Sequence, residues 1–254
     1  MAKNMLRENI MKAVTALKQS DYTVIFTGSG ISVESGIPPF RGPGGIWEKQ
    51  NPIFLDMRYF LRNPKSSWEL IRKIFFDRIE KARPNAAHRA IAVLENRGHV
   101  QSVITQNIDN LHQEAGSRTV YEYHGTIKKL RCTECNTVFP SDEIDLAFLP
   151  PLCSKCGGVL KPDFVFFGEP IPEGIDWLSR GEAENADVML VIGTTGEIKP
   201  ASLIPLTAKR SQSLIIEINI EESRYTKQIT DIFLPGRATD ILTRLADGVI
   251  GNGR

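Results

Sequence analysis

The chain carries four cysteines, and they fall into two pairs with the same spacing. Cys132 and Cys135 enclose two residues, as do Cys153 and Cys156, and seventeen residues separate the pairs. Two such turns can bring four thiolates to the corners of a tetrahedron, which is the geometry that structural zinc prefers. Because protein ligands fill all four positions, the spacing predicts a structural zinc site rather than a catalytic one.

Two other uses of this cysteine pattern are a pair of disulfides and a CxxC redox site. The first eight residues lack the apolar stretch of a secretory signal, so we expect a cytoplasmic protein in which disulfides are disfavoured. A single redox pair would not need a matching second pair.

The bulk composition excludes several classes of protein. With 254 residues, 41% hydrophobic and 24% charged, the chain can bury a full core as one large domain or one domain with a small insertion. No apolar run approaches the roughly 20 residues of a membrane helix, so we expect no membrane partner. The net charge of +1 offers no broad basic field for nucleic acid, and we expect a monomer.

Short apolar runs alternate with segments of helical spacing. Residues 4–18 repeat apolar side chains mostly at helical intervals and predict an amphipathic helix. Runs typical of buried strands cover 22–27, 100–105, 188–193, 214–218 and 232–234, and helix-like segments such as 88–96 and 201–210 separate most of them. This alternation predicts an α/β protein with a doubly wound, Rossmann-like parallel sheet covered on both faces.

Two stretches interrupt the alternation. Residues 36–85 join a loop rich in glycine and proline to helical sequence, and residues 126–162 hold the cysteines. We expect both to be insertions that form a smaller lobe, a zinc-ribbon module beside a helical one. The predicted sheet domain then comprises residues 1–35, 86–125 and 163–254. Ligands should bind in the crevice between the lobes, at the carboxyl ends of the strands.

A glycine-containing loop follows the first predicted strand. Gly28, Ser29 and Gly30 allow a tight turn in which backbone N–H groups can approach a phosphate. Val33 stands where the third glycine of a GxGxxG fingerprint would be. The loop alone therefore fits either a plain strand-to-helix turn or a dinucleotide that is held differently from the usual dehydrogenase manner.

A series of further motifs extends over nearly the whole chain. In order they are residues 28–32, 35–42, 84–88, 105–112, 123–125, 161–169, 193–195 and 217–219. In this order they resemble the sirtuins, the NAD-dependent protein lysine deacylases, and the CxxC pairs stand where that family carries its zinc module. The resemblance implies that the sheet domain binds NAD and that residues 36–85 include the cofactor-binding loop.

The resemblance also implies roles for individual residues. His124 becomes the general base, and an acyl-lysine peptide pairs with the strand of Val165, Phe166 and Phe167. Asp109 and Ile108 bind the nicotinamide. The implied NAD-binding set is Gly28, Ser29, Gly30, Ser32, Phe40, Arg41, Gln106, Asn107, Ile108, Asp109, Gly193, Thr194, Thr195, Asn219 and Ala238.

The residues taken alone allow plainer interpretations. A lone histidine such as His124 is more often a structural residue than a catalyst, although its pKa suits general-base work. Asn107 or Asp109 could cap a helix. The apolar strand at 165–167 could be sheet core.

The function implied by the resemblance is acyl transfer from lysine to ADP-ribose, with release of nicotinamide and O-acetyl-ADP-ribose. NAD glycohydrolysis or mono-ADP-ribosyl transfer would use the same pocket but would not need the peptide strand at 161–169. A zinc-ribbon binding module is a third alternative, supported only by a few basic residues near the cysteines.

Three positions depart from the sirtuin pattern. Ser29 stands where most members carry alanine, and Gly196 replaces a large apolar residue that would pack near NAD, followed by the charged Glu197. Sirtuins that remove succinyl or malonyl groups carry a Tyr-x-x-Arg pair, whereas the matching stretch here is Ile71-Arg72-Lys73-Ile74. We therefore expect neutral acyl groups, acetyl first.

Overall fold

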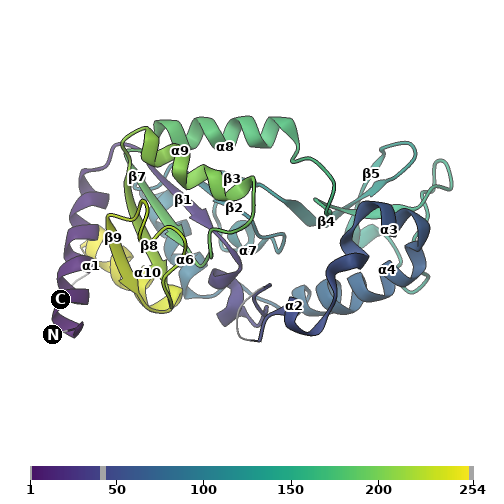
Figure 1. Cartoon of the computed structure of the whole chain (residues 1–254), viewed down its shortest axis with the longest axis horizontal. Coiled ribbons are helices and arrows are strands. Elements are labelled where there is room, and N and C mark those ends of the chain that lie inside the picture. The colour runs from purple at the N-terminus through teal and green to yellow at the C-terminus, as the bar shows by residue number, and fades with distance from the viewer. Residues whose placement is uncertain (1, 41–43, 252–254) are drawn as a thin grey trace.

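A parallel sheet forms the larger lobe in the computed structural model, which describes residues 2–40 and 44–251 (Figure 1). Its strand order is β3-β2-β1-β7-β8-β9, and every neighbouring pair is parallel. The strands are β1 (Thr23–Thr27), β2 (Ser102–Thr105), β3 (Val120–Glu122), β7 (Val188–Ile192), β8 (Leu214–Asn219) and β9 (Ile232–Pro235). All residues of β1, β2 and β7 are buried, as expected of a parallel sheet covered on both faces.

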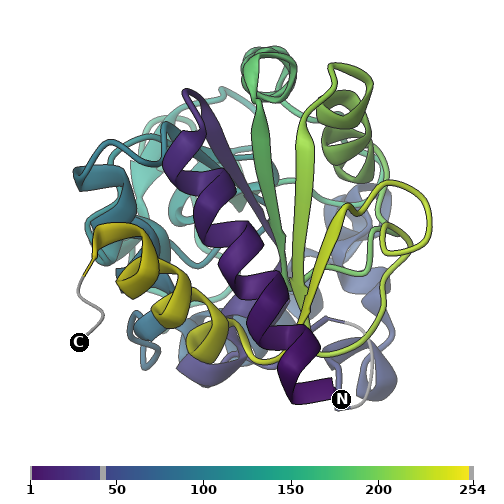
Figure 2. The ribbon, with the colours of Figure 1, turned by 90° about the vertical axis from the view of Figure 1, so that its left-hand side faces the viewer.

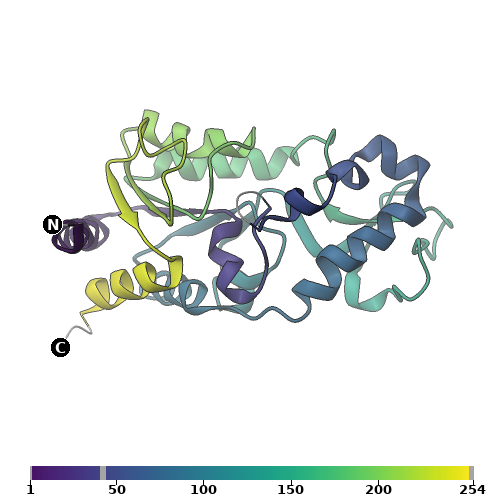
Figure 3. The same ribbon diagram turned by 60° about the horizontal axis from the view of Figure 1, so that its bottom comes forward.

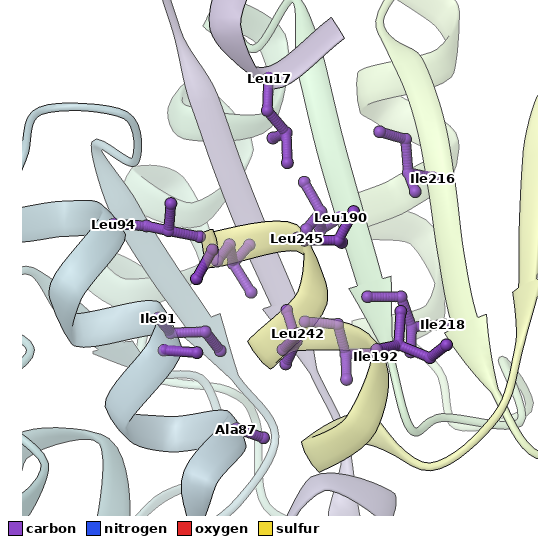
Figure 4. Packing of buried hydrophobic residues seen from close by; sticks show 14 of the residues in the cluster. Leu17, Ala87, Ile91, Leu94, Leu190, Ile192, Ile216, Ile218, Leu242 and Leu245 are labelled. Carbon is purple, nitrogen blue, oxygen red and sulfur yellow. The ribbon is translucent and has the colours of Figure 1, made fainter. Parts of the chain in front are cut away.

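Helices cover both faces of this sheet. On one face lie α1 (Ala2–Gln19), α6 (Ala86–Asn96) and α10 (Ala238–Ile250), and on the other α8 (Glu173–Asn185), the 3₁₀ turn η5 (Ala201–Leu203) and α9 (Ile204–Arg210). Figure 2 shows α1 and α10 side by side, and Figure 3 shows the sheet between its two helical layers. In Figure 4, Ile91, Leu242 and Leu190 meet between α6, α10 and the sheet. The predicted doubly wound α/β fold is confirmed.

The central strands β1 and β7 lie next to each other, but the chain leaves them toward opposite faces. After β1 it continues through the 3₁₀ turn η1 (Ser29–Ser35) and eventually α6, whereas after β7 it continues into η5 and α9. The carboxyl ends of these two strands therefore form the topological switch point, where open α/β sheets bind ligands.

The two predicted insertions together form the second lobe (Figure 1). A three-stranded antiparallel sheet in the order β5-β4-β6 packs against a run of short helices. The strands are β4 (Gly125–Cys132), β5 (Val138–Pro140) and β6 (Leu160–Phe164), with the 3₁₀ turn η4 (Ser141–Glu143) after β5. The helical part comprises α2 (Ile46–Lys49), η2 (Pro52–Leu55), α3 (Met57–Arg62), α4 (Pro64–Ile71), the π turn η3 (Arg72–Phe76) and α5 (Asp77–Ile79).

One apolar core unites the helical insertion with the cysteine-bearing one. Trp68 of α4 is fully buried, and its indole N–H donates to the Leu160 carbonyl of β6 at 2.8 Å. Cys132 and Cys153 lie in the same cluster as Phe54, Phe60 and Trp68. The two insertions therefore depend on each other for burial.

Two elements of the larger lobe escaped sequence-based prediction. Strand β3 has only three residues, all half-buried, and pairs with β2 alone. Helix α8 buries only Ser179 and Ala183 and leaves Trp177 73% exposed, so its apolar periodicity is weak. Within the described residues, no helix is long and apolar enough to cross a membrane.

Candidate functional site

At the switch point, the backbone of the loop after β1 is in direct contact with the backbone of the loop after β7. The Gly28 N–H donates to the Ile192 carbonyl and the Gly30 N–H to the Gly193 carbonyl, each at 2.9 Å. A Cβ on Gly30 would lie 2.6 Å from the Gly193 Cα, and Gly193 has a φ of 61°. These glycines are therefore required by close approach of the β1 and β7 loops. Val33 is 42% exposed on η1, which explains why a third glycine is not needed there.

A buried polar cluster lies beside this loop. The Ser32 hydroxyl donates to Asp109 Oδ2 at 2.7 Å and accepts from Asn107 Nδ2 at 3.1 Å. Asp109 Oδ1 accepts the Leu111 N–H at 3.0 Å, which orients the carboxyl group. Burial raises the pKa of Asp109, while the Ser32 and Leu111 hydrogen bonds oppose that rise. The Ser32 hydroxyl proton is thus committed to Asp109 rather than turned toward solvent.

This cluster forms one wall of a small cavity that faces the second lobe. The opposite wall is apolar, and Phe40 packs there against Trp47 and Phe75 with ring centroids 5.5 Å and 6.2 Å apart. The lining residues are Ser29, Ser32, Ile37, Phe40, Ile46, Ile74, Phe75, Ile79, Asn107, Ile108 and Asp109. The cavity would give a planar amide ligand polar partners on one side and apolar contact on the other.

His124 lies where the two sheets meet, between β3 and β4. Its Nδ1 is 3.0 Å from the Gln106 carbonyl oxygen. Because a carbonyl only accepts, Nδ1 carries the proton and Nε2 keeps its lone pair. Burial lowers the pKa of His124, partly opposed by the hydrogen bond to Gln106. The ring is therefore neutral near pH 7 and able to accept a proton at Nε2.

Polar side chains join the ends of three strands of the larger sheet, β2, β7 and β8. Gln106 Nε2 donates to Thr194 Oγ1 at 3.1 Å, and Asn219 Nδ2 donates to the Thr194 carbonyl at 3.0 Å. The Thr195 carbonyl accepts the Arg224 N–H at 3.1 Å. Ala238 is buried at the start of α10. Arg41 lies outside the described residues.

Two other histidines are buried and have structural partners. His88 Nδ1 accepts the Asn85 N–H in a capping box at the start of α6, and His112 Nε2 lies 3.0 Å from Thr27 Oγ1. Burial lowers the pKa of His88 to about 4 and lowers that of His112 as well. Both rings are therefore neutral structural groups, as expected from their helical sequence context.

The segment after β6 bridges the two lobes. The Val165 N–H donates to the His124 carbonyl at 2.9 Å, and the Phe167 N–H donates to the Leu55 carbonyl at 2.8 Å. Phe166 is 1% exposed, whereas Phe167 is 47% exposed. Gly125 supports this contact because its φ is 78° and a Cβ there would lie 2.8 Å from the Phe164 Cα and clash with the Asp163 carbonyl.

The four cysteine side chains converge in the smaller lobe. Their Sγ atoms all lie within 4.8 Å of one another, with 3.4 Å between Cys132 and Cys156 and 3.7 Å between Cys135 and Cys153. Zinc–sulfur bonds of about 2.3 Å place tetrahedral ligands about 3.8 Å apart. The donor set and its spacing therefore fit a structural zinc ion.

Several residues that shape the site had not been singled out from sequence. Ile37, Ile46, Ile74, Phe75 and Ile79 form the apolar wall of the cavity. The apolar residues at 71, 74, 75 and 79 have the spacing of one face of a helix, which can be detected in the sequence. Which cavity that face would line depended on contacts between segments far apart in the chain.

The fold and site define a Rossmann-like protein whose ligand crevice is closed by a cysteine-bearing second lobe. Comparisons with known proteins identify the family: the Sir2 family model matches residues 28–200. NAD-dependent protein deacylase 2 of Pyrobaculum aerophilum is 47% identical over 241 residues, 94% of this chain and 95% of that protein. An NAD-dependent protein deacetylase of Sulfurisphaera tokodaii is 43% identical over 235 residues, 91% of this chain and 92% of that protein.

Solved structures agree with this assignment. A mutant Sir2 homologue in complex with ADP-ribose matches with a TM-score of 0.91 at 37% identity, over 95% of this chain and 96% of that one. A mutant Sir2 with deacetylated p53 peptide and 3′-O-acetyl ADP-ribose matches with a TM-score of 0.86 at 32% identity, over 93% and 96% of the respective chains. The chain belongs to the Sir2 family.

Proposed function

We propose that this protein is an NAD-dependent protein lysine deacylase, which transfers the acyl group of a modified lysine to ADP-ribose and releases nicotinamide. The observation that carries the proposal is the state of His124, a half-buried neutral imidazole whose Nε2 has no hydrogen-bond partner among the described residues. The names of the relatives support it, since they are NAD-dependent protein deacylases or deacetylases.

The cofactor is proposed to lie along the switch point. Bound NAD supplies the ribose carbon that receives the acyl oxygen. Asp109 and Ile108 would hold the nicotinamide, because the Asp109 carboxylate is oriented by Ser32 and Leu111 and lines the cavity. Gln106 and Asn107 would surround the adjacent ribose, Phe40 would cover it, and Arg41 would lie near the phosphates.

The loops after β1, β7 and β8 would take the rest of the dinucleotide. Gly28, Gly30 and Gly193 leave no Cβ in the way of a close backbone approach. Ser29 lines the cavity, and Thr194, Thr195 and Asn219 would contact the phosphates and the adenosine ribose, with Ala238 near the adenine. Residues 1–35, 86–125 and 163–254 would thus form the NAD-binding domain, 36–85 the cofactor loop and helical module, and 126–162 the zinc module.

The reacting groups have defined roles in this proposal. His124 Nε2 would accept a proton from a ribose hydroxyl, and the Gln106 carbonyl would hold the ring in the tautomer that allows this. Phe40 and the apolar wall would exclude water from the reacting centre. The acyl-lysine peptide would pair with the backbone of residues 165–167, by addition of a strand.

We also propose that the preferred acyl groups are neutral, with acetyl first. The described lining of the cavity contains no cationic side chain. Arg72 points elsewhere, since its guanidinium donates to the Leu146 carbonyl at 2.8 Å and lies 3.9 Å from Asp77. The described lining residues that this helical segment contributes, Ile74, Phe75 and Ile79, are apolar and would not pair with a succinyl or malonyl carboxylate. We retain a monomer and a cytoplasmic location as proposals.

The decisive experiment is mass spectrometry of the products formed from NAD and an acetyl-lysine peptide. Equal amounts of deacetylated peptide and O-acetyl-ADP-ribose are expected from the wild type and His99→Ala, and neither product from His124→Ala. His99 is a suitable control because it is a half-buried turn residue before β2. Free ADP-ribose and nicotinamide with an untouched peptide would contradict the proposal and favour an NAD glycohydrolase. A succinyl-lysine peptide tests the acyl preference and should be the poorer substrate.

A further inference from the structure

A buried ion pair lies under the segment that joins the lobes. The Lys161 side chain is 8% exposed, and its Nζ lies 2.9 Å from Glu169 Oε2. Nζ also donates to the carbonyls of Pro162 at 3.0 Å and Phe164 at 2.7 Å. All three ammonium protons thus have acceptors. In addition, Nζ lies 4.2 Å from the centre of the Phe166 ring, a cation–π contact.

Glu169, the other partner of the ion pair, is also hydrogen-bonded to this segment. Its Oε2 also accepts the Phe166 N–H at 2.7 Å, and its own N–H donates to the Phe166 carbonyl at 3.0 Å. The ion pair therefore binds the Phe164 carbonyl and the Phe166 N–H, the two backbone groups that flank Val165. The Val165 N–H donates to the His124 carbonyl. The backbone of residues 165–167 therefore has little freedom to change its conformation.

We propose that Lys161 and Glu169 are positioning residues for peptide recognition, which hold the backbone of residues 165–167 in the conformation that receives the acyl-lysine peptide. This inference rests on the proposed deacylase function and adds two residues to it. Neither side chain lines the cavity described above, and neither needs to touch the cofactor or the peptide. They act through the backbone groups that they bind.

The position of the bonds argues for this role over a purely stabilising one. Buried ion pairs are often replaceable by apolar residues without loss of stability, so their presence alone explains little. Every hydrogen bond made here by the Lys161 ammonium goes to residues 162–169, within or next to the proposed recognition segment. A second ion pair on the same small sheet, Arg131 with Asp163 at 2.8 Å, has no hydrogen bond to residues 165–167 in the described part of the chain and provides a more exposed comparison.

Steady-state kinetics of Lys161→Met, Glu169→Gln and the control Arg131→Gln test the inference. We expect Lys161→Met to raise the KM for an acetyl-lysine peptide about tenfold, since charge-assisted bonds to the segment are lost. The KM for NAD and kcat at saturating peptide should stay within about twofold of wild type. Glu169→Gln should have a smaller effect because its amide oxygen can still accept the Phe166 N–H, and Arg131→Gln should match wild type.

Peptide affinity measured by calorimetry and melting temperatures complete the test. Weaker peptide binding by Lys161→Met and Glu169→Gln, measured well below the melting temperature of each variant, supports the positioning role, since loss of one partner of a buried pair also lowers stability. A fall in kcat with an unchanged peptide KM, or an equal effect of Arg131→Gln, would overturn it. If Lys161→Met does not fold, Glu169→Gln carries the test, because it keeps both Lys161 bonds to backbone carbonyls. Failure of the deacylase proposal would appear in the wild type, whereas failure of this inference would appear only in the variants.

Discussion

At position 124 a single hydrogen bond decides which ring nitrogen is free. The Gln106 carbonyl accepts a hydrogen bond from the Nδ1–H group, with 3.0 Å between the nitrogen and the oxygen. The Gln106 side chain in turn donates a hydrogen bond to the Thr194 hydroxyl. The tautomer of His124 is thus set by the strand end that also carries the proposed ribose contacts. A change that shifts the Gln106 backbone would therefore disturb the tautomer and orientation of the histidine ring.

The pKa of His124 leads to a prediction about pH. Burial lowers this pKa below its ordinary value of 6.5, so the neutral ring persists as the pH falls through 6.5. The acidic limb of kcat/KM should accordingly lie below pH 6.5. Histidine NMR titration, with His124→Ala to assign the signal, checks it directly. A His124 pKa above 7 would contradict the prediction.

Residue identities at the site were largely predictable from sequence, but their partners were not. The cysteine spacing predicted the cluster that the structure contains. By contrast, Ser32 was predicted only as one of the NAD-binding residues, and the sequence did not indicate that its hydroxyl bonds Asp109, seventy-seven positions away. Such pairings depend on which strand ends become neighbours, and sequence spacing carries no information on that.

At the scale of elements, the loop after β7 explains one departure from the sirtuin pattern. Gly196 lacks the large apolar side chain common at this position, but the ring of Tyr225 occupies the adjacent space. Tyr225 is 2% exposed, and its hydroxyl donates to the Ser202 carbonyl at 3.1 Å. The packing is therefore supplied from the loop after β8.

Replacing Gly196 by valine tests this account. Its φ of 72° disfavours a β-branched residue, and a Cβ would lie 2.9 Å from the Tyr225 ring. We expect Gly196→Val to lower the free energy of unfolding by about 1–3 kcal/mol and to raise the KM for NAD. Urea unfolding and steady-state kinetics measure the two effects. Gly181→Ala in α8 is the control, because no atom lies within 4 Å of its added Cβ and it should not destabilise the protein. An unchanged Gly196→Val protein would refute the packing account.

Element type could be predicted where a segment is apolar throughout, as in the central strands β1 and β7, or repeats apolar residues along one face, as in α1. The helical sequence predicted within residues 36–85 contains a π turn at 72–76. The composition of this run, rich in large apolar residues, does not distinguish hydrogen bonding at i+4 from i+5.

For the whole molecule, zinc and the apolar core of the smaller lobe are linked. Cys132 and Cys153 are buried in the cluster that also contains Trp68 and Phe60 of the helical insertion. The larger lobe has separate clusters on the two faces of its own sheet. Loss of the metal should therefore affect the lobes unequally.

Chelation of zinc is expected to unfold the smaller lobe first. Hydrogen exchange followed by mass spectrometry should show lost protection in β4, β6 and α4, with β1, β7 and β8 still protected. Deacetylation should be lost together with the protection of the smaller lobe and regained when zinc is restored. Equal loss of protection in all strands would show that the lobes do not unfold separately.

Gly125 has a consequence for motion within the molecule. Its missing side chain lets the backbone after His124 press directly against β6, and the His124 carbonyl bonds the Val165 N–H. Because no side chain lies between these two backbones at Gly125, we expect His124 and the segment at 165–167 to move together if the crevice widens. The proposed base and the proposed peptide segment would then keep their relative position while a dinucleotide enters.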